Sequence, residues 1–142
     1  MRPKTRLDSV IKLEEEKEER KLREMAAAGR KVKSAEQALS GARAAAQTDH
    51  RRAASATDWM VADLAHTRAL NEVRSAENAV KSATTAEGAS RQAYTQAHSK
   101  AEALRRAAQA RVDEILSERE KAESKELDEI GVMTFNTSPR SN

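Results

Sequence analysis

Residues 25–46 read MAAAGRKVKSAEQALSGARAAA, and an apolar side chain recurs in them at alternating steps of three and four positions. A second run, in which Glu87 and Ser90 replace two of the apolar residues, extends from Val73 to Ala108. This spacing is the a/d stripe along which two helices wind into a left-handed coiled coil. The chain is only 2% aromatic and is built from strong helix formers. The sequence therefore predicts an all-α protein.

The repeat lapses between the two runs, and this lapse predicts that the chain reverses. Residues 47–58 contain turn and capping residues such as Ser55 and Asp58. We therefore predict a long two-helix antiparallel coiled-coil hairpin. The expected parts are a single coiled-coil domain at 1–131, helix one at about 5–47, a turn at 48–57, helix two at about 58–130 and a flexible C-terminal tail at 132–142.

Local signals mark the ends of the expected helices. The Thr5 hydroxyl can cap helix one together with Asp8, in a capping box in which Asp replaces Glu or Gln. Gly131 directly follows Ile130 and predicts a C-terminal stop for helix two. Helix two is expected to be mostly continuous, and a break at residues 84–88 is the alternative.

Charged residues interrupt the stripe of helix one between Glu14 and Lys21. Either this part is a loose, solvated coil, or its charges face a protein partner.

Large apolar residues gather near the two chain ends, which an antiparallel hairpin brings together. We expect those of the first helix to pack against those of the second. The residues of this end are Leu7, Val10, Ile11 and Leu13 on the first helix and Val112, Ile115, Leu116, Leu127 and Ile130 on the second.

An aromatic-apolar cluster follows the expected turn. It consists of Trp59, Met60 and Val61, with Leu64 and Leu70 farther along. Trp59 either closes the hairpin by lying across the turn, or it forms an exposed docking patch with Met60, because Trp is a favoured interface anchor. Phe135 in the expected tail is either disordered or a docking residue.

Composition excludes several classes of function. The absence of cysteine removes thiolate catalysis, and His50, His66 and His98 are too far apart to form a helical metal pair. We expect no catalytic residues, no cofactor and no metal. Lys and Arg are interleaved with Glu and Asp, which argues against a nucleic-acid surface. No segment resembles a secretory signal or a membrane span, and we expect a cytoplasmic protein without membrane insertion.

Three segments together resemble the FliJ/YscO family of flagellar and type III secretion export proteins. The first is Arg6–Leu13 together with the Glu/Arg-rich residues that follow. The second is Trp59, near the start of the expected second helix, and the third is the closing stretch 118–130, EREKAESKELDEI. The resemblance spans residues 6 to about 130. It implies a non-enzymatic stalk, like the γ subunit of rotary ATPases, located at the inner-membrane export apparatus.

The resemblance also implies partners. The joined chain ends would engage a hexameric export ATPase, and other parts of the rod would reach the membrane export gate protein or export chaperones. It implies that Leu7, Val10, Ile11, Leu13, Leu116, Leu127 and Ile130 pack inside the ATPase-facing end, and that Trp59, Met60, Leu64 and Leu70 can contact the gate or a chaperone. Flagellar and injectisome systems both remain open. The alternative is a passive coiled-coil scaffold, as a parallel homodimer.

Overall fold

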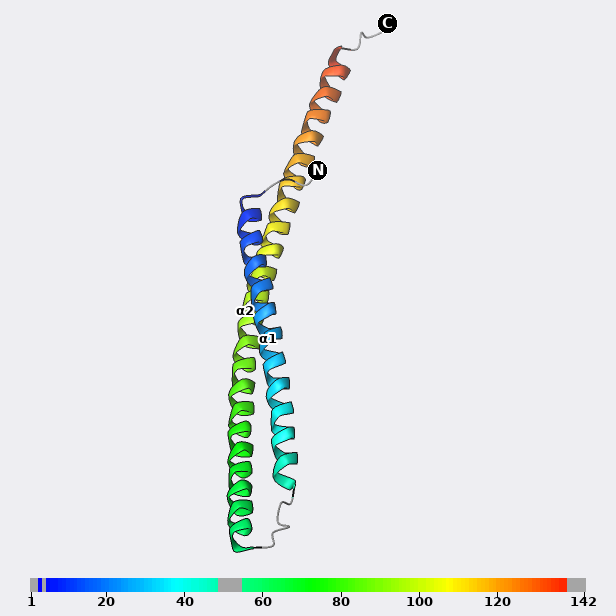
Figure 1. The fold of residues 1–142 in the computed structure, drawn as a ribbon. Coiled ribbons are helices and arrows are strands. Elements are labelled where there is room, and N and C mark those ends of the chain that lie inside the picture. The colour runs from blue at the N-terminus through cyan, green and yellow to red at the C-terminus, as the bar shows by residue number, and fades with distance from the viewer. Residues whose placement is uncertain (1–2, 4, 49–54, 138–142) are drawn as a thin grey trace. The chain divides into compact units, whose positions relative to one another are not determined.

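The computed structural model describes residues 3, 5–48 and 55–137, and two helices make up nearly all of them (Figure 1). Helix α1 spans Leu7–Gln47 and helix α2 spans Ala56–Thr137. The described residues form no strand. The prediction of an all-α two-helix hairpin is confirmed. Residues 49–54 of the predicted turn lie outside the described residues.

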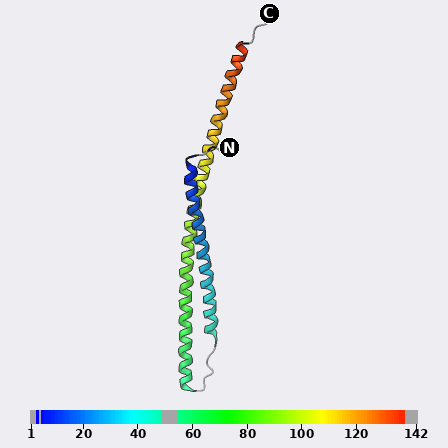
Figure 2. The ribbon, with the colours of Figure 1, turned by 45° about the horizontal axis from the view of Figure 1, so that its top comes forward.

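Contacts divide the chain into two units. The terminal unit contains residues 1–15 and 99–142, and the hairpin unit contains residues 16–98. In the hairpin unit α1 and α2 lie side by side and run in opposite directions (Figures 1 and 2). The antiparallel direction is fixed by facing pairs, since Arg43 bonds to Glu77 and Glu18 bonds to His98.

The predicted stripe is the face along which the helices meet. All seven stripe positions from Met25 to Ala46 are partly shielded from solvent, and so is every stripe position from Val73 to Ala108. The core is narrow because alanine fills most of it. The buried apolar residues of the described chain are Ala62, Ala101, Ala108 and Val112.

Both helices begin at capping boxes built with aspartate. The backbone N–H and the hydroxyl of Thr5 donate to the Asp8 carboxylate at 3.0 and 2.9 Å, as the sequence predicts. The Ser55 hydroxyl accepts the Asp58 backbone N–H at 3.2 Å, and the Ser55 N–H donates back to the Asp58 carboxylate. Because Ser55 is the cap, α2 begins at Ala56, two residues before the predicted start.

Helix α2 is continuous through residues 84–88, as favoured, but the predicted stop at Gly131 is wrong. A glycine stop needs the left-handed backbone conformation, and no described glycine has a positive φ. Gly131 stays helical, and the Thr134 hydroxyl donates to the Ile130 carbonyl at 2.8 Å. The first residues of the predicted tail, 132–137, are therefore the last turns of α2.

Candidate partner-docking surfaces

The terminal unit contains most of the buried apolar side chains. Ala101 and Ala108 are fully buried and Val112 is 3% exposed. Leu7 and Ile11 of α1 are half-buried, whereas Val10 and Leu13 are exposed. A shallow hollow at the start of α1 is lined by Thr5, Arg6, Leu7, Ala107, Arg111 and Ile115. The first turns of α1 thus lie against α2 near residues 107–115.

The predicted packing of Leu116, Leu127 and Ile130 against the start of α1 is wrong. These three side chains are 42%, 68% and 59% exposed. The reason is the register of the two antiparallel helices. The first residue of α1, Leu7, lies near Ala107 and Arg111, so no part of α1 lies beside α2 residues after about 115. Residues 116–137, here called the C-terminal extension, continue α2 beyond the start of α1 within this unit (Figure 2).

The C-terminal extension exposes large apolar residues among charged ones and lacks a covering layer in the described chain. Every residue from 118 to 136 is exposed. Leu116, Leu127 and Ile130 lie on one helix face, because eleven residues complete about three turns and three more residues complete nearly a fourth. For the C-terminal extension, this face is called the stripe. Three more apolar residues, Val132, Met133 and Phe135, lie in the last turns of α2 and are 61%, 67% and 83% exposed. Sequence reasoning considered Phe135 as a docking residue but missed Val132 and Met133.

Charged side chains surround the buried part of the terminal unit. Glu14 is 5% exposed, occupies a stripe position, and faces the Lys100 ammonium at 3.2 Å. Glu15 accepts from Arg105 Nε at 3.0 Å, and Arg105 also bonds to Glu102. The charged interruption in this unit is therefore held by ion pairs to α2 and is not a loose coil.

Arg111 stands on α2 just before the C-terminal extension. Its guanidinium donates to Glu114. This hydrogen bond and the charge of Glu114 raise the pKa of Arg111 above its ordinary value, and the charge of Glu118 adds to the shift.

The hairpin unit has a polar layer of its own. The Glu18 carboxylate lies 2.6 Å from Nδ1 of His98, and Tyr94 stacks on the His98 ring with centroids 5.8 Å apart. Farther along α1, Gly29 leaves space for Glu87, whose carboxylate oxygen would lie 3.7 Å from an added Cβ. Glu87 also accepts from Arg91. Glu18 and Glu87 thus have partners inside the hairpin unit.

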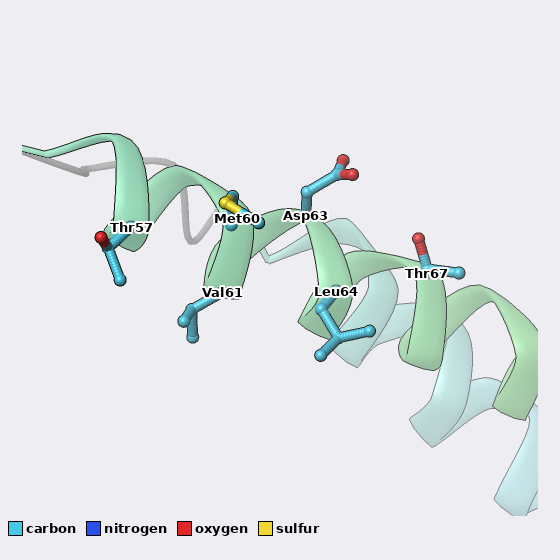
Figure 3. Close-up of a pocket in the computed structure, with 6 residues that line it drawn as sticks. All are labelled: Thr57, Met60, Val61, Asp63, Leu64 and Thr67. Carbon is cyan, nitrogen blue, oxygen red and sulfur yellow. The ribbon is translucent and has the colours of Figure 1, made fainter.

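An apolar patch lies on α2 near its first residue, in the hairpin unit. Met60, Val61 and Leu64 are 74%, 63% and 71% exposed. Figure 3 shows Val61 and Leu64 projecting from the same side of α2, in a shallow hollow that Thr57 and Thr67 complete. The buried Ala62 lies on the same helix face as the stripe residue Val73, eleven positions later, so the patch, defined by Met60, Val61 and Leu64, faces away from the stripe.

Trp59 and Leu70 lie on a different face of α2 from this patch. They are eleven residues apart, which places them on one helix face, and each is 51% exposed. The four residues that sequence reasoning grouped as one contact are therefore divided between two faces.

The described residues contain neither a helical segment that could span a membrane nor a metal-binding cluster. Across the described ranges, neither helix contains a segment apolar enough to cross a bilayer. The same residues contain no cluster of three acidic or histidine side chains that could hold a metal ion. What the structure presents is a set of apolar and charged helix faces.

Comparison with known proteins decides the family. The family model described as Flagellar FliJ protein matches residues 3–140, nearly the whole chain. The chain belongs to the flagellar FliJ protein family. Comparisons with curated proteins and with solved structures gave no match. The resemblance noted in the sequence is confirmed, and of its two systems the match is to the flagellar one.

Membership makes this FliJ-family chain a component of the flagellar protein export apparatus. The family consists of non-enzymatic export components, in keeping with a structure made of exposed helix faces.

Proposed function

We propose that this chain is the stalk of the export apparatus, which binds the hexameric export ATPase through its terminal unit and couples the ring to the membrane export gate. The observation that carries the proposal is the C-terminal extension. It presents Leu116, Leu127 and Ile130 on one exposed face of a helix that α1 does not cover.

Helix energetics support this assignment. Most helical stability in proteins comes from packing an apolar face, and a short helix in water is marginal by itself. Burying one leucine-sized side chain is worth about 1.5–3 kcal/mol. Covering these three side chains therefore contributes favourable free energy to a contact with a partner. A ring with a central channel can cover a projecting helix on several sides at once, which also suits Val132, Met133 and Phe135.

The second part of the proposal concerns the hairpin unit. Its apolar patch of Met60, Val61 and Leu64 is the contact for the export gate protein, and export chaperones are further partners for the same face. Trp59 and Leu70 extend the contact around the helix. The chain itself hydrolyses no nucleotide, so it acts by linking the state of the ring to the gate.

The decisive experiment removes the C-terminal extension. A chain lacking residues 119–142 should fail to stimulate the export ATPase. Because residues 118–136 are all exposed, the truncated chain should keep its hairpin, which circular dichroism and thermal unfolding check. Undiminished stimulation by the truncated chain would refute this placement.

A pair of matched double substitutions tests the stripe itself. Leu127→Ser with Ile130→Ser removes two stripe residues, whereas Val132→Ser with Phe135→Ser removes two apolar residues from the other side of the helix. The first variant should lose most of the stimulation of the ATPase, and the second should retain more of it. Equal loss in both variants would mean that the contact is not made by the stripe.

A further inference from the structure

The C-terminal extension differs in charge from the rest of the chain. Residues 116–137 contain six carboxylates and three basic side chains, a net charge of −3. The chain as a whole has a net charge of +3, and residues 1–115 alone, with 22 basic and 17 acidic side chains, carry +5. The surface that is most exposed to partners is thus acidic within a basic protein.

Two of these carboxylates lie on the apolar stripe. Glu120 and Glu123 stand four and seven residues after Leu116, and Glu123 precedes Leu127 by four, so all share one helix face. Glu118 and Glu129 are also eleven residues apart and share a face, but that face is on the opposite side of the helix. The extension therefore has an acidic pair on its apolar face and an equivalent pair on its back.

Burial of the stripe imposes a condition on whatever covers it. A surface that covers Leu127 and Ile130 also removes water from Glu120 and Glu123. Burying a carboxylate without a cation or hydrogen-bond donor is strongly unfavourable. Intrahelical contacts add little relief. Arg119 stands four positions before Glu123, but Glu120 has no basic residue three or four positions away, and the like charges of Glu120 and Glu123, three apart, disfavour the helix. A purely apolar partner surface would therefore be rejected.

We infer that the surface covering the C-terminal extension is an apolar channel lined by basic side chains, which meet Glu120 and Glu123. This inference rests on the proposed function and adds the chemistry of the ring surface. Lysine or arginine side chains of the ATPase neutralise the two carboxylates while apolar groups cover Leu116, Leu127 and Ile130. The acidic pair then selects the partner and sets the rotational position of the extension.

The test compares charge reversals on the two faces in the full-length chain. Glu120→Lys with Glu123→Lys and Glu118→Lys with Glu129→Lys change the net charge by the same amount. Affinity for the cognate export ATPase hexamer is measured at low salt, and circular dichroism confirms that both variants remain helical. The stripe-face reversal should weaken binding by at least about tenfold, because like charges then meet across the contact. The back-face reversal should change it by no more than about twofold.

The outcomes separate this inference from the proposed function. If the unchanged chain does not bind the ATPase, both fail. If Leu127→Ser with Ile130→Ser abolishes binding while the stripe-face reversal does not, the proposed function stands and the basic channel is refuted. Tighter binding by Glu120→Gln with Glu123→Gln would likewise show that the partner surface is neutral.

A second copy of this chain is the competing occupant, since residues 1–115 are basic. Sedimentation of the isolated chain at low salt tests it. Self-association that the stripe-face reversal removes, without any change in ATPase affinity, would overturn the inference and assign the acidic pair to contacts between copies.

Discussion

Helix α2 contains two regions that differ in the size and the exposure of their apolar residues. Where α1 lies beside it, the two fully buried residues, Ala101 and Ala108, are small. In the C-terminal extension the apolar residues are large, and Leu127 and Phe135 are 68% and 83% exposed. Small side chains allow two helices of one chain to approach closely, whereas large exposed ones leave apolar surface that a partner can cover. Under the proposed function, the small buried residues of α2 serve folding and the large exposed ones serve docking.

The largest expected effect comes from enlarging a buried alanine. Ala108→Leu inserts extra methylene groups where no space exists and should destabilise the fold by about 1–3 kcal/mol. Leu127→Ala in the C-terminal extension should change stability by less than about 0.5 kcal/mol, as exposed positions do. Urea unfolding followed by circular dichroism measures both. If both variants lose a similar amount of free energy of unfolding, the two regions do not differ in their contribution to stability.

The buried charge of Glu14 gives the next test. Lys100→Ala removes the ammonium that faces this carboxylate at 3.2 Å and should cost about 1 kcal/mol, because Lys100 is itself largely exposed. Glu14→Leu replaces a buried charge by an apolar side chain and should stabilise the fold by about 1 kcal/mol. If Glu14→Leu is instead destabilising, the ion pair contributes more than its desolvation costs. Thermal unfolding of the two single variants decides the sign.

The smallest effect on stability is expected at Trp59. Because its side chain is 51% exposed, Trp59→Ala should leave the helices formed and lower the free energy of unfolding by less than about 1 kcal/mol. If Trp59 is an interface anchor, the binding free energy of the Trp59→Ala variant for the export gate protein should be weaker by about 2 kcal/mol. A lower melting temperature combined with unchanged affinity would identify Trp59 as a residue that closes the hairpin.

The sequence predicts the fold well because the fold depends on spacing. Alternation of three and four positions identifies the stripe from Met25 to Ala46, and every one of those residues is partly shielded. The capping box at Thr5 and Asp8 is also predicted, since it needs only neighbouring residues. Such local patterns do not depend on how far one helix extends along the other.

Register and helix ends are harder to predict from the sequence. The expected packing of Leu127 and Ile130 against Leu7 failed because large apolar residues were paired by their nearness to the chain ends. Facing pairs such as Arg43 with Glu77 would have given the register, but charged residues are too frequent in this chain for one pairing to stand out. Gly131 has the right identity for a stop, yet its conformation is helical.

Because alanine fills many layers of the seam, apolar packing alone specifies the register of α1 against α2 only weakly. A seam of similar small residues would fit almost as well after sliding by one heptad, because each alanine layer resembles the next. Glu14 breaks this equivalence, since a slide would carry its carboxylate away from Lys100 while keeping it in the seam. The buried Glu14 therefore helps to set the register of the two helices, as the Glu18–His98 pair does in the hairpin unit. It makes misaligned hairpins costly, at the expense of some stability in the aligned one.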